Sequence, residues 1–177
     1  MDDQTELAPM DAIQSLQILS FVLDEEWFGV EISGIQEVLE YRNVTQVPRT
    51  PDFMLGVINL RGRVIPVVDL RRQFEMHLSA PTVDTCIVII HVEVDGENTP
   101  LGILADRVHE VVEIDTADIK PPPRIGNRIK TAFISGIVRH DEHFIILLRL
   151  SKVFAPEELD LVREQVSQEE PAEWDDV

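Results

Sequence analysis

Apolar residues along the chain recur mostly at every second position, in short runs separated by turn-forming residues. This period is typical of β-strands with one buried face, and Ile, Val and Leu dominate the runs. The chain is therefore predicted to be mainly β. Strands are predicted at residues 16–24, 27–32, 55–60, 63–70, 85–95, 100–104 and 108–114, with a final hairpin at 134–150.

A few short segments depart from the period of two. Ile35, Val38 and Leu39 fall at helical spacing, which predicts a short helix across residues 34–41. Val38 is expected to belong to the core. Further helical pieces are predicted at residues 71–76, after a cap at Ser151, and at residues 157–166.

The hairpin around Asn59-Leu60-Arg61-Gly62 is the most informative local feature. Two apolar runs flank it, and Gly62 suits a turn position with positive φ. Pro66 lies in the returning strand and has no N–H to donate, so it predicts a bulge or an edge there.

An internal repeat organises the chain. Residues 29–48, shifted by 73 positions, match residues 102–121, and residues 56–70, shifted by 80, match residues 136–150. Units of this size built from short strands favour small barrels. We therefore expect one lobe at about residues 16–80 and a second at about 84–155, packed face to face with a groove between them.

The two matching hairpin tips differ in charge. Leu60-Arg61-Gly62-Arg63 is basic, whereas His140-Asp141-Glu142-His143 is acidic, although the apolar framework is shared. The tips are therefore candidate contact points for different partners. Spacing alone leaves two interpretations of Arg61 open: a solvated side chain, or a guanidinium fork that binds carboxylates of a partner.

Charge is concentrated at the ends of the chain. The net charge is -18 over 177 residues, of which residues 1–15 carry -4 and residues 156–177 carry -8. Both ends are predicted to be acidic tails, the second after a polar helix. A field of this sign repels phosphate backbones, so nucleic acid is not an expected ligand.

The expected location is the cytoplasm. Cys86 is the single cysteine, so no intrachain disulfide is expected, and the N-terminal residues lack the apolar region of a signal peptide. The apolar runs are too short to span a bilayer, so no membrane insertion is expected.

Candidate catalytic chemistry is sparse. His140 and His143 beside Asp141 and Glu142 resemble a metal cluster, but a polar hairpin tip is the favoured interpretation because further ligands at fixed spacing are not evident. Cys86 lies in an apolar run, where a thiol packs as a small hydrophobe. The predicted protein is not an enzyme and has no cofactor or metal.

Three segments together resemble the CheW family, the coupling proteins of bacterial chemotaxis. They are residues 29–38, residues 56–62 and residues 66–71, and the resemblance extends from about Leu16 to Phe154. It implies two SH3-like β-barrels, no catalytic activity, and binding to two partners. These are the cytoplasmic tip of chemoreceptors, held in a groove between the lobes, and the regulatory domain of the histidine kinase CheA.

The resemblance also implies where the partners bind. A receptor tip is a helical hairpin, so its recognition would use aliphatic anchors in a groove, with Ile35 as one of them, and a few polar pairs. The protein would then be found at receptor arrays by the inner membrane. The implied receptor- or kinase-binding residues are Ile35, Glu37, Gly56, Asn59, Arg61, Gly62 and Val111.

Two other hypotheses stay open at this level. The chain could be a homologous adaptor of another chemosensory pathway, such as one that controls twitching motility. It could also be a metal-dependent β-barrel enzyme that uses His109, His140 and His143. Tightly bound stoichiometric metal would favour the enzyme.

Overall fold

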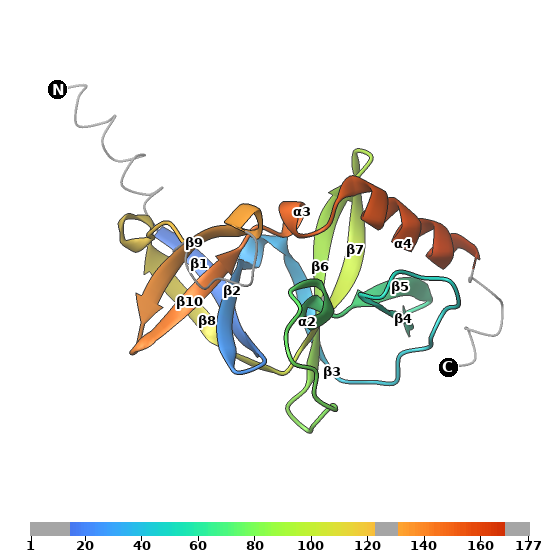
Figure 1. Ribbon diagram of the computed structural model, residues 1–177, viewed down its shortest axis with the longest axis horizontal. Coiled ribbons are helices and arrows are strands. Elements are labelled where there is room, and N and C mark those ends of the chain that lie inside the picture. The colour runs from blue at the N-terminus through green and yellow to red at the C-terminus, as the bar shows by residue number, and fades with distance from the viewer. Residues whose placement is uncertain (1–14, 123–130, 169–177) are drawn as a thin grey trace.

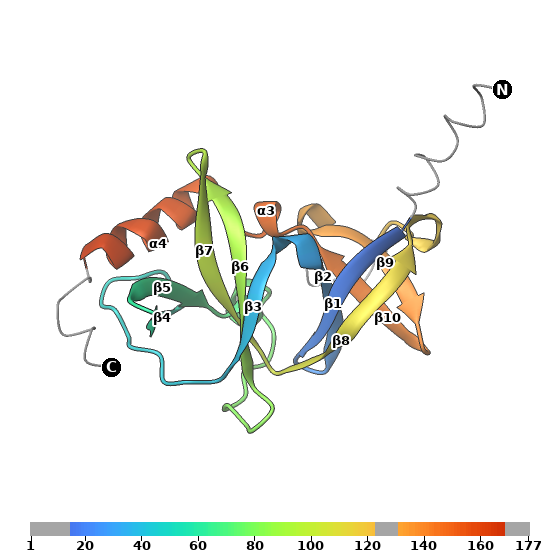
Figure 2. The ribbon, with the colours of Figure 1, turned by 180° about the vertical axis from the view of Figure 1, so that it is seen from behind.

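The computed structural model describes residues 15–122 and 131–168. These residues form ten strands and a few short helices, seen from two opposite sides in Figures 1 and 2. The first half contributes β1 (Ser15–Leu23), β2 (Glu26–Glu31), η1 (Ile32–Gly34), β3 (Ile35–Glu40), β4 (Met54–Leu60), β5 (Arg63–Val68) and α2 (Leu70–Gln73). The second contributes β6 (Cys86–Val94), β7 (Glu97–Ala105), β8 (Arg107–Asp115), η2 (Thr116–Asp118), η3 (Thr131–Phe133), β9 (Ile134–His140), β10 (His143–Leu148), α3 (Leu150–Val153) and α4 (Pro156–Gln168). The prediction of a mainly β protein with short helices is confirmed.

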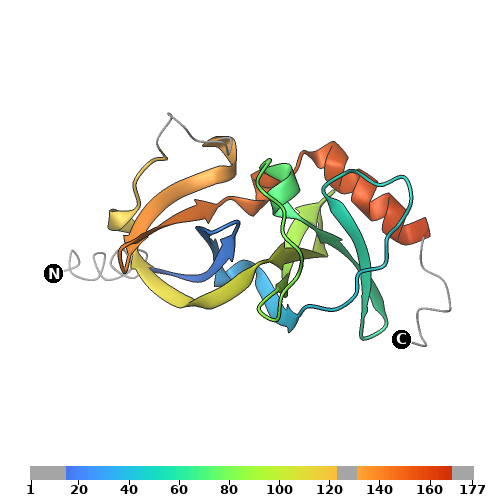
Figure 3. The ribbon, with the colours of Figure 1, turned by 60° about the horizontal axis from the view of Figure 1, so that its bottom comes forward.

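The strands form two five-stranded sheets, each curled into a small barrel. The first barrel has the strand order β3-β6-β7-β5-β4, and the second has the order β8-β1-β2-β10-β9. Each repeat therefore places its leading hairpin in the other repeat's barrel. Figure 3 shows the blue strands β1 and β2 beside the yellow and orange strands of the second half.

This exchange makes the predicted lobe boundaries wrong. Neither residues 16–80 nor residues 84–155 form a barrel alone, because β2 pairs in parallel with β10, and β7 pairs in parallel with β5. A sequence repeat identifies which strands are equivalent, but it does not say whether each hairpin pairs within its own repeat or with the other.

The repeat itself has a structural counterpart. In the second barrel β1 pairs with β8, and in the first barrel β6 pairs with β3 at matching positions: Ile18 lies opposite Val112, and Ile87 lies opposite Leu39. Val112 and Leu39 are the residues that the shift of 73 aligns. The two barrels are therefore related by an approximate twofold arrangement of equivalent elements.

Each barrel closes through a backbone bridge at a glycine. Thr45 and Val57 exchange backbone hydrogen bonds of 2.9 and 2.8 Å beside Gly56. A Cβ at Gly56 would lie 2.0 Å from the carbonyl oxygen of Thr45. Only glycine permits this close approach of the two backbones. In the second barrel Lys120 bridges Ile137 next to Gly136, where a Cβ would lie 2.3 Å from the Ile119 side chain.

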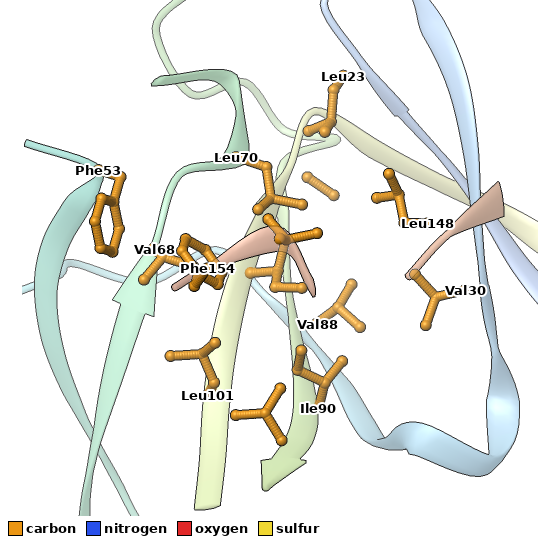
Figure 4. Packing of buried hydrophobic residues seen from close by; sticks show 14 of the residues in the cluster. Leu23, Val30, Phe53, Val68, Leu70, Val88, Ile90, Leu101, Leu148 and Phe154 are labelled. Carbon is orange, nitrogen blue, oxygen red and sulfur yellow. The ribbon is translucent and has the colours of Figure 1, made fainter. Parts of the chain in front are cut away.

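Apolar side chains form three separate clusters. Ile65 and Ile87 lie inside the first barrel, and Ile145 and Val138 lie inside the second. A larger cluster fills the junction between the barrels, and part of it appears in Figure 4. Its labelled members are Leu23, Val30, Phe53, Val68, Leu70, Val88, Ile90, Leu101, Leu148 and Phe154.

A buried ion-pair network joins α2 to the chain between β7 and β8, where the chain passes from the first barrel to the second. The Arg71 guanidinium donates to Asp69 Oδ2 and to Asp106 Oδ1, both at 2.9 Å. Asp106 in turn accepts from the backbone N–H of Asp24 at 2.7 Å. Although burial alone lowers the pKa of Arg71, the hydrogen bond and charge of Asp69, together with the charge of Asp106, raise it. The sequence did not single out this network.

Two local predictions are wrong. Residues 34–41 contain β3 rather than a helix, and only the 3-10 turn η1 precedes it. Ser151 does not cap α3, which begins at Leu150 after an Arg149 that makes no side-chain cap. The prediction for Pro66 agrees with the structure. Pro66 pairs with Val57 of β4 close to a register shift in that strand, and it lies just outside the short parallel pairing of β5 with β7, which covers Val67 and Val68.

The final helix confirms the polar helix predicted near residues 157–166. In α4, Leu159 and Val162 are buried against the junction cluster, whereas Leu161 is exposed. No helix among the described residues is long and apolar enough to cross a membrane. The acidic tails predicted at the two ends fall almost entirely outside the described residues.

Candidate functional site

The tip of the β4–β5 hairpin is a tight two-residue turn. Arg61 and Gly62 both have positive φ, 51° and 86°, which is the geometry of a type I′ turn. The Asn59 side chain accepts a hydrogen bond from the Gly62 N–H at 2.9 Å. Asn59 and Gly62 therefore hold the turn, and Arg61 is presented at its apex, with a side chain that is 67% exposed.

A β-bulge in β3 places Glu37 next to this tip. Ile35 lies opposite Ile90 and Glu37 lies opposite Ile89, so Gln36 is an extra residue in β3. The Glu37 carboxylate accepts hydrogen bonds from the Arg61 guanidinium and, at 2.9 Å, from the Gln36 amide. The structure therefore brings together Glu37 and Arg61, which the resemblance implied separately.

The electrostatics of this cluster favour the charged carboxylate. Hydrogen bonds from Gln36 and Arg61 lower the pKa of Glu37, and the nearby charges of Arg61 and Arg42 lower it further. Arg42 also donates to the backbone oxygen of Asn59 at 3.3 Å. Arg42 is thus a member of the site that the sequence did not indicate.

Two valines form the apolar part of the exposed surface. Val38 on β3 is 41% exposed and Val111 on β8 is 53% exposed, and the shift of 73 residues aligns them. Ile35 and its counterpart Val108 are only partly exposed and pack against the junction cluster. The expectation that Val38 belongs to the core is therefore wrong, whereas Ile35, expected to be an exposed anchor, is half-buried.

The valines lie on strands that face the same side of the molecule. Figure 2 shows β3, β1 and β8 in the foreground, on either side of the junction between the barrels. Gly56, by contrast, is buried at the closure of the first barrel. It positions the hairpin and offers no contact surface of its own.

The described residues do not assemble a nucleophile. The Cys86 thiol donates to the Asp84 carbonyl oxygen at 3.4 Å, and burial raises its pKa, which disfavours the reactive thiolate. His143 stacks on the Trp27 ring with centroids 4.5 Å apart. His140 lies opposite His143 across the hairpin, but its side chain has different partners, since it approaches Glu110 and Asp141.

Comparison with known proteins gives a consistent family. The CheW-like domain family matches residues 17–158. The chemotaxis protein CheW of Treponema pallidum is 31% identical over 152 residues, covering 82% of this chain and 86% of that protein. The protein FrzA of Myxococcus xanthus is 35% identical over 130 residues, covering 71% and 76%.

A solved structure agrees in fold. The scaffolding protein TtCheW from Thermoanaerobacter tengcongensis superimposes with a TM-score of 0.71 at 38% identity, covering 79% of this chain and 88% of that one. The enzyme hypothesis is therefore wrong. The chain belongs to the CheW family and is a non-catalytic coupling adaptor of chemotaxis signalling.

Proposed function

We propose that this adaptor links the cytoplasmic tip of chemoreceptors to the regulatory domain of the histidine kinase CheA, and that the Glu37–Arg61 tip and the exposed valines form its receptor-binding surface. The adaptor would act at receptor arrays on the cytoplasmic side of the membrane. By family resemblance, the regulatory domain of CheA has the same fold as this adaptor. Contacts of the adaptor with that domain would use the barrel ends.

The main support is the exposed Arg61 guanidinium, which Glu37 holds at the hairpin tip. The carboxylate restricts the arginine, so less side-chain entropy is lost when Arg61 meets a partner. Val38 on β3 and Val111 on β8 are two exposed aliphatic side chains, and Figure 2 shows both strands in the foreground. Aliphatic anchors together with a few polar pairs are typical of the recognition of an amphipathic helix.

The proposed roles predict which changes matter. A central interface residue of this kind contributes about 2 kcal/mol or more when truncated. Charge reversal at Arg61 would in addition place a carboxylate beside Glu37 and beside acidic groups of the partner. Arg63 follows in the same hairpin, is also exposed, and makes no ion pair among the described residues. It is therefore the matched control.

The experiment compares Arg61→Glu with Arg63→Glu in a reconstituted assay of kinase autophosphorylation. Receptor binding and kinase binding are measured separately by sedimentation of receptor-containing membranes and by pull-down with CheA alone. We expect Arg61→Glu to lose receptor binding and receptor-dependent kinase stimulation, with CheA binding retained, and Arg63→Glu to behave as wild type. Unchanged receptor binding in Arg61→Glu would refute the assigned surface.

A further inference from the structure

The second barrel has its own version of the Glu37 bulge. Ser20 lies opposite Glu110 and Phe21 lies opposite Val108, so His109 is the extra residue in β8. The shift of 73 residues aligns His109-Glu110 with Gln36-Glu37. The Ser20 hydroxyl donates to the Glu110 carbonyl oxygen at 2.9 Å and accepts from its N–H at 3.3 Å. The backbone that carries Glu110 is therefore fixed.

Among the described residues, the second barrel has no counterpart of the cation that neutralises this carboxylate in the first barrel. The shift of 80 residues aligns Arg61 with Asp141, and both have positive φ at a hairpin tip. The tip of the second barrel thus points a second carboxylate toward the bulge. The side chain between them is His140, whose Nε2 lies 3.8 Å from Glu110 Oε2 and 3.3 Å from Asp141 Oδ2.

These three groups have the spacing of metal ligands. One donor atom from each of Glu110, His140 and Asp141 lies within 4.8 Å of the others. In a tetrahedral zinc site with bonds of about 2.0–2.1 Å, donor atoms lie about 3.3–3.4 Å apart. His109 Nδ1 lies 3.5 Å from the same Glu110 oxygen, but His109 is outside this group of three, so it could serve as a fourth donor only by turning away from the Trp27 ring.

Other cationic or imidazole groups nearby are already engaged. The Arg107 guanidinium lies 5.5 Å from the centre of the Trp27 ring, His143 stacks on the same ring, and the His109 ring meets it edge-on with centroids 4.8 Å apart. His140 is not part of this stack. Its imidazole is therefore the one that remains directed at the two carboxylates.

We propose that Glu110, His140 and Asp141 bind a divalent transition-metal ion, with His109 able to complete the site. The ion would occupy the place that the Arg61 guanidinium takes in the first barrel, and would join the tip of the second barrel to its bulge. A set of imidazole and carboxylate donors suits Zn²⁺, Ni²⁺ or Cu²⁺, whereas Mg²⁺ prefers oxygen donors alone.

Calorimetric titration of the full, EDTA-treated chain with Zn²⁺ tests the proposal. We expect one site that His140→Ala weakens by more than about tenfold. Asp141→Arg should abolish binding, because it supplies the cation found in the first barrel. His77→Ala is the matched control, since His77 is exposed but lies outside the cluster, and it should bind as wild type.

Three results would overturn the site. The first is the absence of zinc binding by the wild-type chain. The second is zinc uptake that His140→Ala leaves unchanged, as expected if acidic residues elsewhere bind the ion non-specifically. The third is Mg²⁺ that competes equally with Zn²⁺, which would contradict a site built around His140. Circular dichroism of each variant separates loss of the site from loss of the fold.

Discussion

Glu37 and Arg61 form an ion pair across the seam of the first barrel. Glu37 lies on β3 and Arg61 follows β4, and these are the two edge strands of the sheet. The pair therefore lies where the barrel closes, close to the bridge between Thr45 and Val57. A partner that binds Arg61 would therefore bind at the place where the edge strands β3 and β4 of the first barrel meet.

This ion pair predicts a defined pH dependence. Because Gln36 and Arg61 lower the pKa of Glu37, its contribution to stability is complete above the ordinary pKa of a glutamate and is lost as pH falls through the lower, folded-state value. Carboxyl NMR titration should give a Glu37 pKa below that of exposed glutamates. Gln36→Ala and Arg61→Ala should each raise it, and an unchanged pKa in both variants would contradict the assigned contacts.

The exposed valines should matter for binding and not for folding. Val111→Asp and Val38→Asp each add a charge to the surface proposed for the receptor, so we expect receptor binding to fall by about tenfold or more. Sedimentation with receptor-containing membranes measures this loss. Val83→Asp is the control, because Val83 is fully exposed in the connector before β6. Equal loss in all three variants would indicate a general effect of charge.

Gly56 should be intolerant of any side chain. A Cβ there would meet the Thr45 carbonyl oxygen at 2.0 Å, so closure of the barrel would have to shift. We expect Gly56→Ala to lower the free energy of unfolding by about 2–3 kcal/mol. Gly34→Ala meets nothing within 4 Å and should change it by less than about 1 kcal/mol. Urea unfolding of both variants decides the point.

Arg71 should be needed for stability and not for recognition. Its removal would leave Asp69 buried without its cation, because the Asp69 side chain is only 2% exposed. We expect Arg71→Ala to cost about 3–5 kcal/mol in the free energy of unfolding. The neighbouring Arg72 is exposed, and Arg72→Ala should cost less than about 0.5 kcal/mol. Similar costs for both, measured by urea unfolding, would show that the network is unimportant.

The features that were predicted correctly from the sequence are those that depend on residues close together along the chain. Both hairpin tips, the β character and the equivalence of the two halves follow from local alternation, turn residues and the repeat. The family resemblance then supplied Glu37 and Arg61 as site residues. Their direct pairing depends on the Gln36 bulge and on barrel closure, which no local pattern reveals.

The failures have physical causes as well. Val38 faces outward on β3, whereas the other apolar residues of that strand are partly buried. Together with Ile35 and Leu39 it gave apolar residues at helical spacing, and a helix was therefore wrongly predicted. The lobe boundaries failed because strand exchange is a choice between equivalent long-range pairings. The Asp69–Arg71–Asp106 network was missed because Asp106 lies 35 residues beyond Arg71.

The exchange of hairpins also means that one repeat, without the other, could not complete the barrel that it forms in this protein. A chain with a single repeat would lack the β1–β2 or β6–β7 hairpin that completes its barrel, and a second copy could supply it. Such an assembly is a domain-swapped homodimer, and this protein has the architecture of that dimer with its two chains fused. A cut in the connector at residues 77–83 would therefore leave two interlocked fragments rather than two separable domains.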